Sequence, residues 1–234
     1  MGGFANNAPI VTDGLVFYVD AGNGNSYPGS GTTWSDLVGG NDGTFSATPT
    51  TGSGNGGSIV FDGVDDLCSF PSDASPVTDA ISVGLWYNGH PTVNNASVTV
   101  RSEYGTGSAQ RIFNTHIPWS DGTIYWDCGT NGAGSYDRIS KAGNNVHRGW
   151  NYWVFWKDAN AASNRMKIYL NGSLWHQGAG GTKTMPSATA LTIGGKSHGA
   201  DYDNGTFSNV SIYNRALSDS EILQNYNALK NRFV

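Results

Sequence analysis

The sequence predicts an all-β protein, a sandwich of two antiparallel sheets closed by one short C-terminal helix. Short runs of alternating apolar and polar residues, bounded by Gly, Asn, Asp or Pro, recur along the 234 residues, and this period of two is typical of strands that expose one face. Glycine is frequent, at 33 residues, and charged residues are only 13% of the chain, which favours a β protein rich in turns. A helical period occurs only near the C-terminus.

The expected strands are all too short to be buried helices. The clearest local prediction is a hairpin in which Asn171 and Gly172 form a type I′ turn, because Asn-Gly between two alternating runs matches the twist of paired strands. In chain order, we expect strands at 14–20, 58–61, 66–70, 81–87, 97–104, 111–116, 123–128, 150–157, 165–170, 173–177, 190–193 and 205–213.

The segment 22–57 is rich in Gly, Ser, Thr and Asn, and we expect it to be a long ordered loop, since apolar residues interrupt it and can anchor it to a core. These anchors are Trp34, Leu37, Val38 and Phe45. No domain boundary is therefore expected there. We predict an N-terminal arm over 1–13 and a single domain over 14–234.

The helical segment near the C-terminus has a start signal. Ser218 and Glu221 form the pattern of a capping box, in which each residue's side chain satisfies a backbone N–H of the other. The apolar residues that follow at helical spacing are Ile222, Leu223, Tyr226 and Leu229. We expect a helix over about 218–230 that docks on the sandwich, because so short a helix is marginal alone.

Charge and targeting signals restrict the expected partners. The net charge is −5 and no cluster of Lys and Arg occurs along the sequence, so we expect neither nucleic acid nor an anionic membrane as a partner. The N-terminal residues lack a signal peptide, and no apolar stretch is long enough for a transmembrane segment. We therefore expect a soluble protein that stays where it is made.

The two cysteines leave one question open. Cys68 and Cys128 could form a disulfide, but their spacing does not show that they are close. Cysteines in strands also act as small buried apolar residues.

Carboxylate chemistry gives little sign of an enzyme. Hydrolysis of a glycosidic bond usually requires two carboxylates beside the scissile oxygen, and the chain has only two glutamates, Glu103 and Glu221. Glu221 is expected to cap the helix, and Glu103 lies at a strand end beside Arg101. We therefore expect no catalytic residues, although a pair of aspartates could still serve a glycan hydrolase or lyase.

Clusters of Asp and Asn in predicted loops could hold a structural Ca²⁺, which prefers carboxylate and carbonyl oxygens. The alternative is that Asp and Asn are simply good turn formers. The candidate ligands, in three clusters, are Asp20 with Asn23, Asp62 with Asp65 and Asp66, and Asp201 with Asp203 and Asn204.

The segment 148–158 predicts a strand that is aromatic on both faces. Alternation places Tyr152 and Trp156 on one face and Trp153 on the other, and Trp86 in a neighbouring strand could share the face of Tyr152. Only one face can form the core between the sheets. The second face either stacks on sugars, with Trp86, Tyr152 and Trp156 as a glycan-binding platform, or lies under a loop or a neighbouring subunit.

Several segments together resemble one family. The runs 14–23, 26–37, 57–66, 168–172 and 210–218, which include GLVFYVDAGN, GSIVFDGVDD, IYLNG and VSIYNRALS, resemble laminin G-like jelly rolls of the concanavalin A type. The ending EILQNYNALKNRF at 221–233 is most similar to versions found in structural proteins of tailed phages. Two positions depart from the family pattern: Asn209 stands where an acidic residue is usual, and Cys68 replaces an apolar residue.

This resemblance implies a two-sheet jelly roll, often with Ca²⁺ at its rim, that binds glycans or proteins. It implies a non-catalytic protein of a phage particle, such as a capsid decoration, with capsid or other virion proteins as partners, a possible glycan ligand and possible homo-oligomers. Its location would then be the virion, after synthesis in the host cytoplasm. The alternatives are a free carbohydrate-binding lectin and, less favoured, a glycan hydrolase or lyase.

Overall fold

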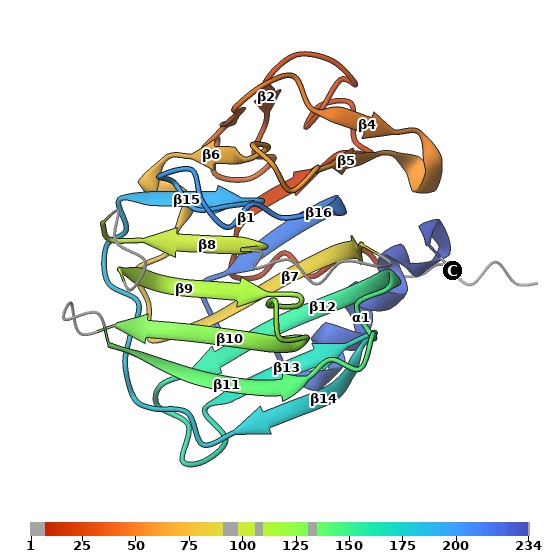
Figure 1. The fold of residues 1–234 in the computed structure, drawn as a ribbon. Helices are drawn as coiled ribbons and strands as arrows, with labels where there is room; N and C mark the ends of the chain where they lie inside the picture. The colour runs from red at the N-terminus through yellow and green to blue at the C-terminus, as the bar shows by residue number, and fades with distance from the viewer. Residues whose placement is uncertain (1–7, 91–97, 106–109, 131–134, 234) are drawn as a thin grey trace, which may run out of the picture.

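The computed structural model describes residues 8–90, 98–105, 110–130 and 135–233, and these form two antiparallel sheets stacked face to face (Figure 1). The first sheet has the order β14 (Ser173–Gly178), β13 (Met166–Leu170), β12 (Gly149–Asp158), β7 (Ala80–Gly89), β16 (Gly205–Tyr213), β5 (Ser58–Val60) and β4 (Thr50–Gly52), with β1 (Leu15–Asp20) also paired to β16. The second has the order β11 (Tyr136–Ala142), β10 (Thr123–Thr130), β9 (Arg111–His116), β8 (Val100–Glu103), β15 (Ala190–Ile193), β6 (Cys68–Phe70), β3 (Gly43–Phe45) and β2 (Thr33–Trp34).

The main core lies between the two sheets. Trp153 and Phe155 of β12 point into it and are completely buried, and Phe155 packs on Trp126 of β10 with ring centroids 5.5 Å apart. Cys68 and Cys128 are free thiols buried in this core. They therefore do not form a disulfide and act as small apolar residues.

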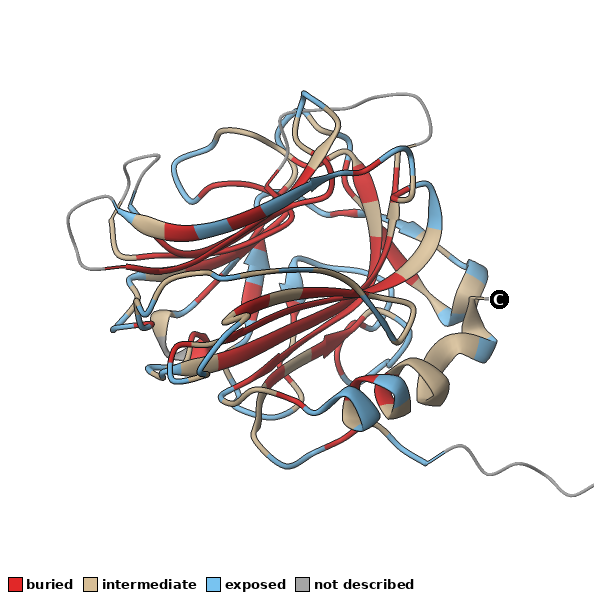
Figure 2. Ribbon diagram, turned by 90° about the horizontal axis from the view of Figure 1, so that it is seen from below, coloured by how far each residue is buried: buried red, intermediate tan, exposed pale blue. Residues whose placement is uncertain are grey.

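A second, smaller core lies on the outer face of the first sheet, under helix α1 (Asp219–Leu229) (Figure 2). Ile222 of the helix packs there, and the helix is followed by the 3-10 turn η3 (Lys230–Arg232). Residues 1–7 of the predicted N-terminal arm lie outside the described residues. Val11, in the described part of the arm, contacts the helix, since its backbone N–H donates to the side-chain oxygen of Asn225 at 2.8 Å. Among the described residues, no helix combines the length and apolar character needed to cross a bilayer.

The structure confirms the fold class and most of the predicted elements. The capping box of Ser218 and Glu221 is present, and Asn171 and Gly172 both adopt the positive φ that a type I′ turn requires. Of the predicted anchors in the segment 22–57, Trp34 and Phe45 are buried. The prediction for Val38 is wrong, because this residue is 46% exposed. The sequence prediction missed β11 and the short strands β2, β3 and β4.

Candidate functional site

The predicted glycan-binding platform is covered in the structure. Trp86, Tyr152 and Trp156 do lie together on the outer face of the first sheet, but they are only 0%, 3% and 7% exposed. The indole of Trp86 stacks between Tyr226 of α1 and Phe233, with ring centroids 5.7 and 4.1 Å away. The platform prediction is therefore wrong, because the C-terminal segment occupies the surface on which a sugar would stack.

Two of the three predicted calcium clusters have their carboxylates engaged by the chain itself. Asp20 accepts two hydrogen bonds from the guanidinium group of Arg232, at 2.8 and 3.0 Å. The Asn23 side chain accepts the backbone N–H of Asn25 and so stabilises a turn. Arg232 thus provides the positive charge next to Asp20.

The cluster of Asp201 and Asp203 is the second of these two. Asp201 forms an ion pair with Lys196. Asp203 is completely buried and accepts the hydroxyl of Tyr87 at 2.8 Å. Burial, reinforced by the charge of Asp203, raises the pKa of Tyr87 well above its ordinary value, so this phenol remains a donor to the carboxylate.

The remaining cluster brings three carboxylates together, and two of them, Asp62 and Asp66, also accept backbone N–H groups of the same loop. Among the described residues, Asp62, Asp65 and Asp66 form the group of carboxylates whose oxygens lie within 4.8 Å of one another. Burial and the neighbouring charges of Asp62 and Asp65 raise the pKa of Asp66. These hard oxygen ligands fit Ca²⁺, and a cation would relieve the repulsion between them.

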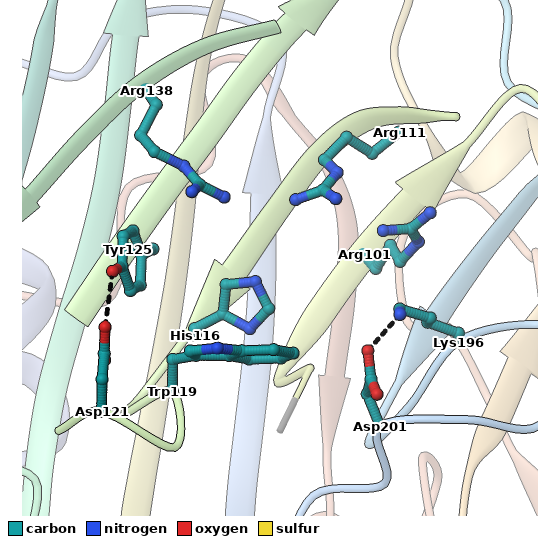
Figure 3. Close-up of a pocket in the computed structure, with 9 residues that line it drawn as sticks. All are labelled: Arg101, Arg111, His116, Trp119, Asp121, Tyr125, Arg138, Lys196 and Asp201. Carbon is teal, nitrogen blue, oxygen red and sulfur yellow. Dashed lines mark hydrogen bonds and ion pairs between the residues drawn. The ribbon is translucent and has the colours of Figure 1, made fainter. Parts of the chain in front are cut away.

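A pocket of about 200 Å³ opens on the outer face of the second sheet, over β8, β9, β10 and β11 (Figure 3). Strand register explains why its residues meet, since Arg101, Asn114, Asp127 and Arg138 lie directly opposite one another across these four strands. We call it the basic pocket. Its lining residues are Arg101, Arg111, His116, Trp119, Asp121, Tyr125, Arg138, Lys196 and Asp201.

One buried carboxylate holds two of the guanidinium groups in this pocket. Asp127 is completely buried and accepts hydrogen bonds from Arg111 Nη1 at 2.5 Å, Arg138 Nε at 2.5 Å and Arg138 Nη2 at 2.8 Å. These hydrogen bonds raise the pKa of Arg138. Arg138 also stacks over the ring of Tyr125 and Arg111 over that of Tyr136, with 4.5 and 4.3 Å to the ring centres. Both forks are therefore fixed in orientation before any ligand arrives.

The floor and the far side of the pocket are formed by two further ion pairs. Arg101 is fully buried and donates through Nε to Glu103 at 2.6 Å. Its burial lowers its pKa, although Glu103 opposes this effect. Lys196 and Asp201 pair across a turn in which the backbone N–H of Lys196 donates to the carbonyl of Ala200 at 3.0 Å.

The loop between β9 and β10 provides the aromatic side. Trp119 is half-buried, and its ring packs against that of His116 with centroids 4.5 Å apart. Asp121, which is exposed, accepts the Tyr125 hydroxyl at 2.8 Å and the Thr123 N–H at 2.9 Å. Although burial raises it, these hydrogen bonds hold the pKa of Asp121 below its ordinary value.

Sequence reasoning did not identify this pocket. Four of the 13 Lys and Arg residues line it, but they are separated along the chain and show no linear cluster. The available signal was the position of Arg101 and Arg111 within predicted strands. Charged residues at alternating positions of consecutive strands come together once the strands pair. The strand that carries Arg138 was not predicted, so the sequence could not show that Arg138 lies opposite Asp127.

The comparison with protein families decides the family. One family model, of the laminin G type, matches residues 61–223, which is more than half of the chain. It is described as the concanavalin A-like lectin/glucanases superfamily. The chain belongs to the concanavalin A-like lectin/glucanase superfamily. The search of curated protein sequences gives no significant match.

Solved structures show that this superfamily fold recurs in proteins of distant sequence. Domain 4 of a GH43 arabinanase from Geobacillus stearothermophilus, in complex with arabinotriose, has 17% identity and a TM-score of 0.65, and the match covers 91% of this chain and 98% of that one. The binding domain of botulinum neurotoxin DC, in complex with rat synaptotagmin II, has 13% identity and a TM-score of 0.69. The match covers 92% of this chain and 52% of the toxin chain.

A sialidase from Trypanosoma rangeli, in complex with sialic acid, has 17% identity and a TM-score of 0.66, with 97% of this chain and 35% of the sialidase covered. This superfamily chain therefore spans about a third of the sialidase and about half of the toxin domain. Likenesses at such low identity concern the fold alone.

Proposed function

We propose that this protein is a non-catalytic glycan-binding module and that the basic pocket is its binding site. The observation that carries the proposal is the half-buried indole of Trp119 beside fixed hydrogen-bonding groups in one pocket. An aromatic ring offers a large rigid surface to the apolar face of a sugar, and a few oriented polar groups fix its position. Membership of a lectin/glucanase superfamily, and the arabinanase domain of similar length with arabinotriose, support it.

A glycan array probed with the full chain, with and without Ca²⁺, tests this proposal. We expect binding by the wild-type protein and its loss in Trp119→Ala. Trp175→Ala is the matched control, because Trp175 is also half-buried but lies on β14 of the other sheet. Binding that survives Trp119→Ala would contradict the assignment of the pocket, and an array without any bound glycan would contradict the function.

The non-catalytic part of the proposal is supported by the state of the pocket's carboxylates. Asp121 and Asp201 both line the pocket, and a glycosidase needs one carboxylic acid with a raised pKa. The pKa of Asp121 is lowered instead, and Asp201 is paired with Lys196. We expect a panel of polysaccharides to be recovered uncut after incubation. New reducing ends or unsaturated products would favour a hydrolase or a lyase.

We also propose that the protein is part of a tailed-phage particle, most simply as a capsid decoration or another virion-associated protein. The support is the resemblance of the segment 221–233 to phage structural proteins, together with a chain that is poor in charged residues. Immunogold electron microscopy and mass spectrometry of purified particles should detect the protein on the shell or tail. Its presence only in the soluble fraction of a lysate would favour the alternative, a free lectin.

A further inference from the structure

The two guanidinium groups that share Asp127 give the basic pocket a chemical preference. Arg111 and Arg138 together carry two positive charges, and both bind the one carboxylate of Asp127. In Figure 3 their guanidinium groups point toward one another, and both bind the carboxylate of Asp127, which the figure does not draw. Among the described side chains, the two guanidinium groups thus carry one more positive charge than the carboxylate that they share. An anion on the pocket side of Arg138 would add a second negative charge beside them.

The other charged groups of the pocket are already matched locally. Glu103 compensates Arg101, and Asp201 compensates Lys196. Asp121 lies on the loop side, where it accepts the hydroxyl of Tyr125 and is exposed to solvent that screens its charge. In Figure 3, Asp121 and Asp201 lie on the opposite side of the pocket from the Arg111 and Arg138 guanidinium groups. The pocket therefore has a basic end and an acidic rim.

We propose that the basic pocket binds an acidic sugar, a ring that carries a carboxylate, with Arg138 and Arg111 as the carboxylate-binding pair. This proposal rests on the glycan-binding function proposed above and names its ligand class. The Nε and Nη2 atoms of Arg138 already donate to Asp127, and the Nη1 side of the same planar group can donate to a second carboxylate. The exposed oxygens of Asp121, at the acidic rim, can accept the hydroxyls of the same ring.

The size and the aromatic wall of the pocket fit one sugar ring. About 200 Å³ is less than the roughly 300–1,000 Å³ of pockets that enclose drug-sized ligands, so a single acidic residue of a polysaccharide can enter while its neighbours stay outside. Trp119 then stacks on the sugar ring, and the arginines bind its carboxylate. Arg138 is the accessible member of the pair, since its side chain is 39% exposed and that of Arg111 10%.

Isothermal titration of the full chain with matched oligosaccharides tests the proposal. The probes are oligogalacturonate, the same oligomer with its carboxylates reduced to alcohols, dextran sulfate and neutral dextran. We expect oligogalacturonate to bind and the reduced oligomer to bind at least about tenfold more weakly, because it loses hydrogen bonds to a charged group. Arg138→Gln should weaken oligogalacturonate binding by about 10- to 100-fold.

Two further variants separate charge from geometry. Arg138→Lys keeps the charge but loses the fork, so it should still bind at least about tenfold more weakly than wild type. Arg148→Gln removes an exposed arginine outside the pocket and should bind like wild type. Circular dichroism and the melting temperature of each variant show whether it is folded before binding is compared.

The possible results discriminate this proposal from the function on which it depends. Equal binding of the acidic and the reduced oligomers would overturn the acidic-sugar class but leave glycan binding intact. If dextran sulfate bound and oligogalacturonate did not, the carboxylate proposal would be overturned, and the pocket would instead recognise a sulfate ester. If neither these probes nor a glycan array gave binding, the glycan-binding function itself would fail.

Discussion

The indole of Trp86 stacks on the ring of Phe233, with centroids 4.1 Å apart and planes at 16°. Residue 233 thereby covers the centre of the first sheet's outer face. We expect Phe233→Ala to lower the free energy of unfolding by about 1–3 kcal/mol, because it exposes part of a fully buried indole. Urea denaturation measures the loss. Leu223→Ala, on an apolar side chain of α1 that is 45% exposed, should change stability much less.

The covered aromatic residues and the basic pocket lie on different sheets, so variants can tell them apart. Trp86→Phe should keep the wild-type glycan affinity if it folds, whereas Trp119→Ala should lose it. A loss of affinity in folded Trp86→Phe would return the binding site to the outer face of the first sheet.

The sequence predicted the helix and its apolar side but not the face of the sandwich on which the helix docks. Both faces of β12 are aromatic, and alternation alone assigns neither face to the helix. The strand β11 was missed for a different reason. Asp137 of β11 is buried where an apolar residue would mark a strand, and it is compensated by Lys157 from a strand of the other sheet. Such a pairing is visible only after folding.

The same distinction applies to the site. Period-two patterning predicted the strands β9 and β10 well, so the scaffold of the basic pocket could be foreseen. Its chemistry could not, because the row from Arg101 to Arg138 depends on the register of three strand pairs. The Trp119 position depends on the loop between β9 and β10, where local turns decide the geometry.

The buried ion pair between Lys157 and Asp137 gives the largest expected effect on stability. Lys157 is completely buried, and its Nζ donates to Asp137 at 2.6 Å and to the carbonyls of Cys128 and Gly181 at 3.2 Å. Asp137→Asn leaves this ammonium without its counter-charge and should cost about 3–5 kcal/mol of unfolding free energy. Chemical denaturation measures the difference.

A second lysine on the same carboxylate provides the control. Lys183 also binds Asp137, at 3.0 Å, but its side chain is 27% exposed. Lys183→Ala should cost no more than about 1 kcal/mol. Equal losses in Lys183→Ala and Asp137→Asn would show that burial of Lys157 is not what makes the pair important.

The cap of α1 predicts an acid-sensitive contribution to stability. Hydrogen bonds from Arg215, followed by those from Ser218, lower the pKa of Glu221 from 4.5 to about 2. Because the folded pKa is below the unfolded one, this stabilisation is complete above pH 4.5 and is lost as the pH falls toward about 2. Glu221→Gln should therefore cost about 1 kcal/mol at neutral pH, and the difference from wild type should shrink in acid.

Thermal unfolding of both proteins across this pH range measures the effect. Asp13→Asn is the control, since Asp13 also pairs with Arg215 but its side chain is 86% exposed. It should leave the pH dependence unchanged. A Glu221→Gln deficit that stays constant down to pH 2 would contradict the assigned cause.

Calcium, if it binds, is expected at Asp62, Asp65 and Asp66, where three carboxylates repel one another. Titration with CaCl₂ should then raise the melting temperature, because a ligand of the folded state alone stabilises it. Asp65→Asn should weaken calcium binding on the order of tenfold, since affinity depends on the number of charged ligands, and should not destabilise the calcium-free protein. Asp79→Asn, at an exposed aspartate outside the cluster, should bind calcium like wild type. A melting temperature that does not respond to millimolar calcium would rule out a calcium site here and leave the three aspartates as turn formers.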